Sequence, residues 1–69
     1  MNITKAMKNK ILRILDTATE LTEVEKNILR MFLGEEKTLD EIAETLQIRR
    51  ERVRQLKQKA LRRLKLLET

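Results

Sequence analysis

Apolar residues recur at steps of three and four along most of the chain, and this spacing places them on one face of an α-helix. The first helix is expected over about residues 3–18, and a second is expected from Thr22 to about Leu33, where Gly34 stops it. The apolar face of the first helix holds Ile3, Met7, Ile11, Ile14, Leu15 and Ala18, and the second buries Ile28, Leu29 and Phe32.

Two threonines are each followed three residues later by glutamate, a spacing that lets the two side chains satisfy free backbone donors at a helix start. Thr22 with Glu25 predicts the start of the second helix, and Thr38 with Glu41 predicts the start of a third, short helix over residues 39–46. Residues 47–49 are too few for anything but a tight turn.

A fourth helix is predicted from Arg50 to about Leu67, with two faces of different character. Its apolar face holds Val53, Leu56, Ala60, Leu64 and Leu67. Its opposite face holds Glu51, Arg54, Gln55, Gln58 and Arg62.

Composition supports one small all-α domain over residues 1–69, a compact four-helix unit. The 69 residues include a single Gly, a single aromatic residue and no Pro, so turns and strands have little support. The chain has no Cys and no His, which removes disulfides, thiolate nucleophiles, imidazole bases and the commonest zinc ligands. We therefore expect no enzyme activity, no metal and no cofactor.

Charge is distributed unevenly along the chain. Residues 20–48 carry three cations and eight acids, whereas residues 49–69 carry nine cations and two acids. Such a basic surface attracts polyanions, above all nucleic acid. No apolar run approaches a membrane span and the N-terminus does not resemble a signal peptide, so a soluble intracellular protein is expected.

Two helices joined by a three-residue turn, the second with an exposed polar face, indicate a helix-turn-helix over about residues 38–66. With Leu39 as the first position, Ala43 is the small residue where the helices touch, and Gln47 departs from the pattern because Gly is favoured there. A plain helical hairpin is the alternative. The apolar positions of the motif are Ile42, Leu46, Ile48, Val53 and Leu56.

In such a motif the first turns of the second helix enter the DNA major groove. Arg can bond guanine with two donors, Gln can bond adenine, and Glu can accept from the amine of cytosine. The predicted base contacts are therefore Arg50, Glu51, Arg54 and Gln55.

Simpler interpretations exist for the same residues. Glu51 lies in the first helical turn, three residues before Arg54, so the two can form an ordinary surface ion pair. The remaining cations can contact phosphate, face an acidic partner or only keep the surface soluble; they are Lys57, Lys59, Arg62, Arg63 and Lys65.

Three blocks of sequence closely resemble region 4 of bacterial sigma factors of the sigma-70 family, and the likeness covers about residues 4–66. The first runs from Leu21-Thr22 through Glu25 to Met31, the second is Thr38-Leu39-Asp40-Glu41-Ile42, and the third joins RERVRQ at residues 50–55 to KALRRL at residues 59–64.

The resemblance implies recognition of the promoter minus-35 element by a domain docked on the flap of the RNA polymerase β subunit, in the bacterial cytoplasm at the nucleoid. It implies that Arg50, Glu51, Arg54 and Gln55 contact base edges or the adjacent DNA backbone. It also implies an activator-facing surface at Arg62, Arg63 and Lys65, and flap contacts for which Ile14, Leu15, Ile28 and Phe32 are candidates. The expected backbone contacts are Arg49, Lys57, Gln58, Lys59, Leu39 and Asp40.

Departures from the family pattern leave other functions open. Arg49 replaces a usual Thr cap, and Val24 and Phe32 stand near positions where the family carries Arg. The chain is also too short to hold the minus-10-reading part of a sigma factor. It can instead be a small interaction protein that binds the flap or an anti-sigma factor with little DNA binding, or a stand-alone regulator. When isolated it is expected to be a monomer.

Overall fold

Every regular element in residues 4–64, the part of the chain that the structure describes, is helical. The structure is a computed structural model, and it confirms the all-α prediction. The elements are α1 (Lys5–Ile14), the 3₁₀ turn η1 (Leu15–Thr17), α2 (Glu23–Leu29), the π-helical turn η2 (Arg30–Gly34), α3 (Leu39–Leu46) and α4 (Arg50–Arg63).

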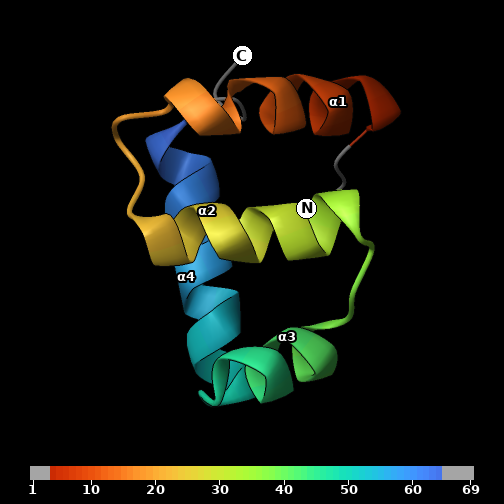
Figure 1. Cartoon of the computed structure of the whole chain (residues 1–69), viewed down its shortest axis with the longest axis vertical. Coiled ribbons are helices and arrows are strands. Elements are labelled where there is room, and N and C mark those ends of the chain that lie inside the picture. Colours follow the sequence, from red (N-terminus) through yellow and green to blue (C-terminus); the bar gives the residue numbers. More distant parts are fainter. Residues whose placement is uncertain (1–3, 65–69) are drawn as a thin grey trace.

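The long helix α4 forms a spine against which the other elements pack (Figure 1). The continuous α2–η2 segment crosses α4, and α1 lies on one side of that segment, toward the C-terminal end of α4. The short α3 lies at the N-terminal end of α4, and the two form a helix-turn-helix. This arrangement leaves the outer face of α4 uncovered.

Both predicted capping motifs are confirmed. The Thr22 hydroxyl accepts from the Glu25 N–H at 3.2 Å, and the Glu25 carboxylate accepts from the Thr22 N–H at 2.9 Å. Thr38 and Glu41 repeat the same pair of bonds at the start of α3. These bonds use orphan donors of the two helices and fix where each begins.

The turn between α3 and α4 has the geometry expected from the sequence. Gln47 adopts φ 56° and ψ 44°, the left-handed conformation in which Gly is favoured. The Ile48 N–H then bonds the Ala43 carbonyl at 3.1 Å, which closes the end of α3. Gln47 therefore adopts a conformation that costs a residue with a Cβ about 1 kcal/mol relative to Gly.

The segment after α2 differs from the prediction of one regular helix. A bond of 3.1 Å from the Glu35 N–H to the Arg30 carbonyl spans five residues and widens the last turn into η2. The wider turn rotates the later side chains about the axis. Met31 and Leu33 are consequently buried, whereas Phe32 is only half-buried.

The core consists of two neighbouring clusters that both include part of α4. The half-buried Phe32 packs against both clusters. The first cluster joins α1, η1, the α2–η2 segment and the C-terminal part of α4: Ile11, Leu15, Ala18, Leu21, Leu29, Leu33, Ala60 and Leu61. The second cluster joins α2–η2 to the helix-turn-helix: Ile28, Met31, Ile42, Ala43 and Val53.

The predicted faces of α1 and α4 need two corrections. Met7 and Ile14 are half-buried at the margin of the core rather than inside it, and of the predicted apolar face of α1 only Ile11 is buried within the helix itself. On α4, Leu61 is 1% exposed and belongs to the core, although the predicted apolar face omitted it. Ile3 and Leu67 lie outside the described residues.

Candidate nucleic-acid interface

The predicted base-contact residues occupy the first two turns of α4. Arg50, Glu51 and Gln55 are exposed, and Arg54 is half-exposed. Three of them, together with Leu39 from α3, line a shallow hollow of about 350 Å³ between the starts of the two helices. The helix-turn-helix thus holds polar groups of both charges on one open surface.

Within this surface Glu51 and Arg54 form the ion pair that the sequence left open. Arg54 donates from Nε to Glu51 Oε2 at 2.9 Å and from Nη2 to the same oxygen at 2.7 Å. The hydrogen bonds from Arg54 lower the pKa of the Glu51 carboxyl, and the carboxylate raises the pKa of Arg54. Both groups therefore stay charged at neutral pH.

A second ion pair connects the two helices of the motif. Arg50 Nε lies 3.6 Å from the Asp40 carboxylate, and both side chains are exposed. Exposed pairs of this kind contribute little to stability, about 0 to 1 kcal/mol. Arg50 can therefore exchange Asp40 for another anion at small cost.

The four predicted backbone-contact residues in or next to α4 divide into two groups. Arg49, Gln58 and Lys59 are exposed on α4, and Arg49 makes no side-chain cap at the helix start. Lys57 instead lies over the ring of Phe32, with Nζ 4.2 Å from the ring centroid. Burial and, secondarily, the nearby Arg54 lower the pKa of Lys57. Lys57 thus faces η2 rather than the open side of α4.

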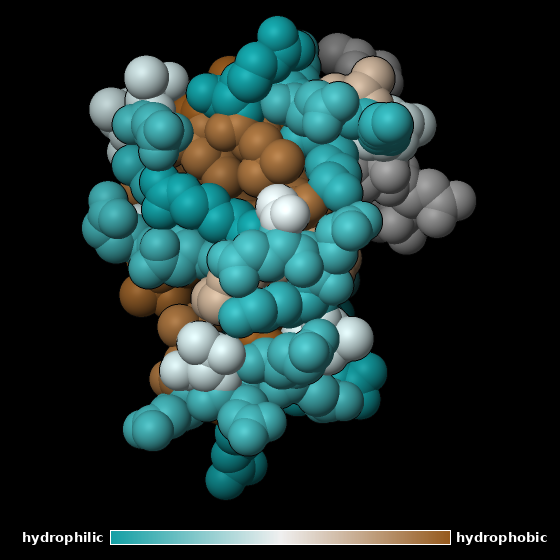
Figure 2. Space-filling model, turned by 45° about the vertical axis from the view of Figure 1, so that its right-hand side comes forward, coloured by the Kyte–Doolittle hydropathy of each residue, from teal (hydrophilic) through white to brown (hydrophobic). Residues whose placement is uncertain are grey.

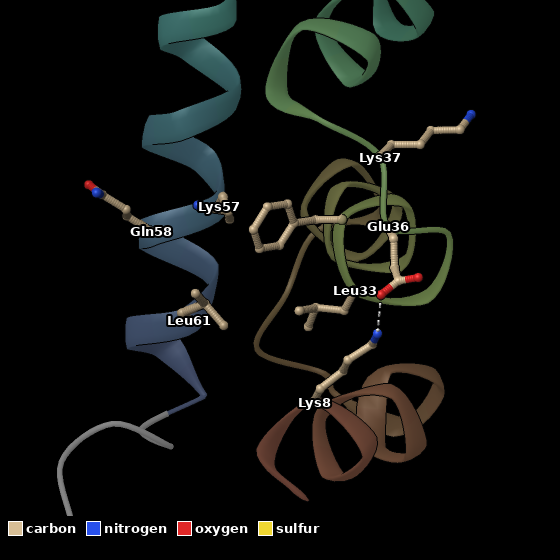
Figure 3. Close-up of a pocket in the computed structure, with 8 residues that line it drawn as sticks. Lys8, Leu33, Glu36, Lys37, Lys57, Gln58 and Leu61 are labelled. Atoms are coloured by element: carbon tan, nitrogen blue, oxygen red, sulfur yellow. Dashed lines mark hydrogen bonds and ion pairs between the residues drawn. The ribbon is translucent and has the colours of Figure 1, made fainter. Parts of the chain in front are cut away.

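The Lys57 side chain lines a groove of about 490 Å³ between α1, η2 and α4, here named the Phe32 groove (Figure 3). Its apolar floor comes from Phe32, Leu33 and Leu61, and its rim carries Lys8 bonded to Glu36 at 3.2 Å. Elsewhere the surface is mostly hydrophilic, although Figure 2 shows apolar surface enclosed by hydrophilic side chains on one face. An apolar groove with a cationic rim suits an apolar helix with acidic flanks.

The candidate flap residues are not all accessible. Leu15 is 1% exposed and Ile28 is not exposed at all, because both lie within the core clusters. A docked partner cannot contact them in this conformation. Ile14 and Phe32 are half-buried, and Phe32 alone of the four lines the groove.

The sequence analysis missed a long-range contact made by Glu25. Its side chain is 2% exposed, and its Oε1 accepts from Arg63 Nη1 at 2.9 Å in addition to capping α2. Arg63, expected on an activator-facing surface, is thus held against α2. Arg62 is exposed, and Lys65 lies outside the described residues. The sequence did not indicate this ion pair, because the capping motif already accounted for a glutamate at position 25 and the same carboxylate makes both contacts.

No helix within residues 4–64 is both long and apolar enough to cross a membrane. The same residues contain no cluster of three or more acidic side chains arranged to hold a metal ion.

The fold and the exposed face of α4 define the class of the protein: it is a helix-turn-helix domain in which α4, the second helix of the motif, presents a polar face. The chain belongs to the family of sigma-70 region 4 domains, since the family model described as "Sigma-70, region 4" matches residues 19–66.

Two relatives carry the name RNA polymerase sigma factor SigA. The one from a Bacillus species is 40% identical over 63 residues, which are 86% of this chain and 16% of the relative. The one from Clostridium acetobutylicum is 37% identical over 65 residues, which are 88% of this chain and again 16% of the relative. The chain thus spans about a sixth of these relatives' length. No solved structure matches it significantly.

Proposed function

We propose that this chain recognises the minus-35 element of bacterial promoters while docked on the flap of the RNA polymerase β subunit, in the cytoplasm. The observation that carries the proposal is the open set of Arg50, Glu51, Arg54 and Gln55 on the first turns of α4. These side chains supply donors and acceptors for each type of base.

Electrostatics support binding to a duplex. Exposed cations flank the base-facing residues, with Arg49 before them and Lys59 after them on α4. Many of the acids lie on α2 and α3, whereas α4 itself carries a single acid, Glu51. Phosphate contacts from such cations orient a domain on DNA, whereas base contacts give the sequence preference.

The test is fluorescence anisotropy with a duplex carrying TTGACA and a scrambled duplex of equal composition, over a salt series. We expect a preference for TTGACA that persists as salt is added, and Arg54→Ala should reduce it by roughly 1 to 3 kcal/mol. Arg62→Ala is the matched control, because it removes the same charge from an exposed site near the other end of α4.

Arg62→Ala should weaken binding to both duplexes alike. If the two duplexes bind the unaltered chain equally and with the same steep salt dependence, α4 serves only as a phosphate-binding surface and base recognition is excluded.

A second candidate function is that of an interaction protein that occupies the flap with little DNA binding. The Phe32 groove favours it, since the partly exposed Phe32 lies there beside the buried Leu33 and Leu61, and such an apolar floor is a natural site for a partner helix. Val24, which is 48% exposed, adds apolar surface elsewhere on the domain. Loss of duplex preference together with retained flap binding would select this function.

A further inference from the structure

Arg54 is held from two directions by side chains of its own helix. Glu51, three residues earlier, accepts from Nε and Nη2, and Gln58, four residues later, accepts from Nη1 through Oε1 at 3.1 Å. These spacings place all three side chains on one face of α4. The guanidinium is thus fixed in the absence of DNA.

The two partners use different parts of the guanidinium. Nε–H and one Nη2–H form a lateral pair of donors, and Glu51 occupies both. Each terminal nitrogen carries two hydrogens, so one N–H on Nη1 and one on Nη2 remain available. Where Gln58 takes the Nη1–H that points back toward Cδ, the two donors that remain are parallel, which is the arrangement that guanine N7 and O6 require.

We propose that Gln58 is a positioning residue that sets which donors Arg54 offers to a base, rather than a residue that chiefly binds the DNA backbone. This inference rests on the proposed function. Because a guanidinium has no acceptor, the Gln58 amide must turn its oxygen toward Arg54. Figure 3 shows the Gln58 side chain directed away from Leu33 and Lys8, toward the outer side of α4.

Gln58 adds a restraint that Glu51 does not supply, because Glu51 holds Nε and Nη2 whereas Gln58 holds Nη1. An arginine side chain loses considerable rotamer entropy when it is fixed. If a contact in the free protein already restrains it, less entropy is lost when DNA binds. Gln58 supplies this contact without a charge. A second carboxylate there would compete with the base for the same donors.

The experiment compares Gln58→Met, which keeps length but cannot accept this bond, with the unaltered chain. The duplexes carry TTGACA or the same site with single base pairs replaced. We expect Gln58→Met to reduce discrimination at the guanine that Arg54 reads by about fivefold, the effect of one hydrogen bond, with scrambled-duplex affinity unchanged. In an Arg54→Ala background the same substitution should change nothing.

Equal weakening on every duplex would mean that Gln58 binds phosphate and would overturn the inference. Unchanged discrimination, or an undiminished effect of Gln58→Met in the Arg54→Ala background, would also overturn it. Gln58→Glu adds a negative charge beside the duplex and should therefore lower affinity for all duplexes. If it instead leaves every affinity unchanged, residue 58 does not lie near the bound DNA and the inference is overturned.

A measurement without DNA separates this inference from the proposed function. In the free protein, nuclear magnetic resonance of the Arg54 side chain reports rotation about the Nε–Cζ bond. Gln58→Met should speed this rotation, and an unchanged rate would overturn the inference even if promoter recognition holds. If the unaltered chain shows no duplex preference, the proposed function fails while the faster rotation would still establish that Gln58 holds Arg54.

Discussion

At the scale of single residues, Glu25 links parts of the chain far apart in sequence. Its carboxylate caps α2 and accepts from Arg63 near the end of α4. One of its oxygens, Oε2, is buried without a hydrogen-bond partner in residues 4–64. A buried carboxylate is costly unless it is paired, so this site depends on Arg63.

We predict that Glu25→Ala lowers the free energy of unfolding by about 2 kcal/mol, because it removes a cap of α2 and the charged hydrogen bond from Arg63. Urea unfolding followed by circular dichroism measures it. Glu23→Ala is the matched control in the same helical turn. Glu23 is exposed, and its ion pair with Lys26 is long, at 3.7 Å, so its loss should cost little. A loss below about 1 kcal/mol in Glu25→Ala would show that the pair is not structural.

Arg63 also illustrates the limit of sequence reasoning for single residues. Its position on a basic helix suggested an activator-facing role, and nothing in a helical pattern identifies the acid that it contacts from α2. Arg54 and Glu51 are the opposite case, because their spacing on one helix already indicated that they can form an ion pair, and the structure contains it. Contacts within an element follow from spacing, whereas contacts between elements need the fold.

At the scale of elements, the capping motifs defined the starts of α2 and α3, and α3 ends as predicted at Leu46. The turn was also predictable, because three residues between two helices require a left-handed residue. The π turn η2 was not predictable from periodicity. One extra residue in a turn changes which side chains face inward, and the usual spacing of three and four does not represent it.

The left-handed turn yields a prediction at this scale. Gln47→Gly should raise the free energy of unfolding by about 1 kcal/mol, because Gly adopts φ 56° without a Cβ clash. Thermal or urea unfolding measures the gain. Gln47→Ala keeps the Cβ and should give no gain, and equal stabilisation by Ala and Gly would mean that the backbone at residue 47 is unstrained.

At the scale of the whole molecule, the polar face at the start of α4 and the Phe32 groove are separate surfaces that meet near Gln58. A domain that binds DNA with one surface and a polymerase subunit with the other needs this separation. The charge division along the sequence anticipated the basic surface. The groove was not foreseen, because its walls come from three elements far apart in the chain.

The Phe32 groove yields a prediction at the scale of the whole molecule. If the β flap docks in it, Phe32→Ala should weaken binding to a flap fragment about tenfold or more, as truncation of a central aromatic anchor does. Isothermal titration calorimetry measures the affinity, and circular dichroism verifies folding. Val24→Ala is the control, because Val24 is exposed and does not line the groove. Equal losses in both variants would place the flap elsewhere.

The division of the core into two clusters bears on how this domain opens. One cluster holds α1 to the C-terminal half of α4, the other holds α3 to its N-terminal half, and Phe32 packs against both. Such an arrangement favours partial opening, in which backbone amides of α1 exchange with solvent while α3 and the first turns of α4 stay closed. The exposed polar face at the start of α4 is then insulated from opening at the N-terminal end, and a ligand bound beside Phe32 would slow exchange in both halves at once.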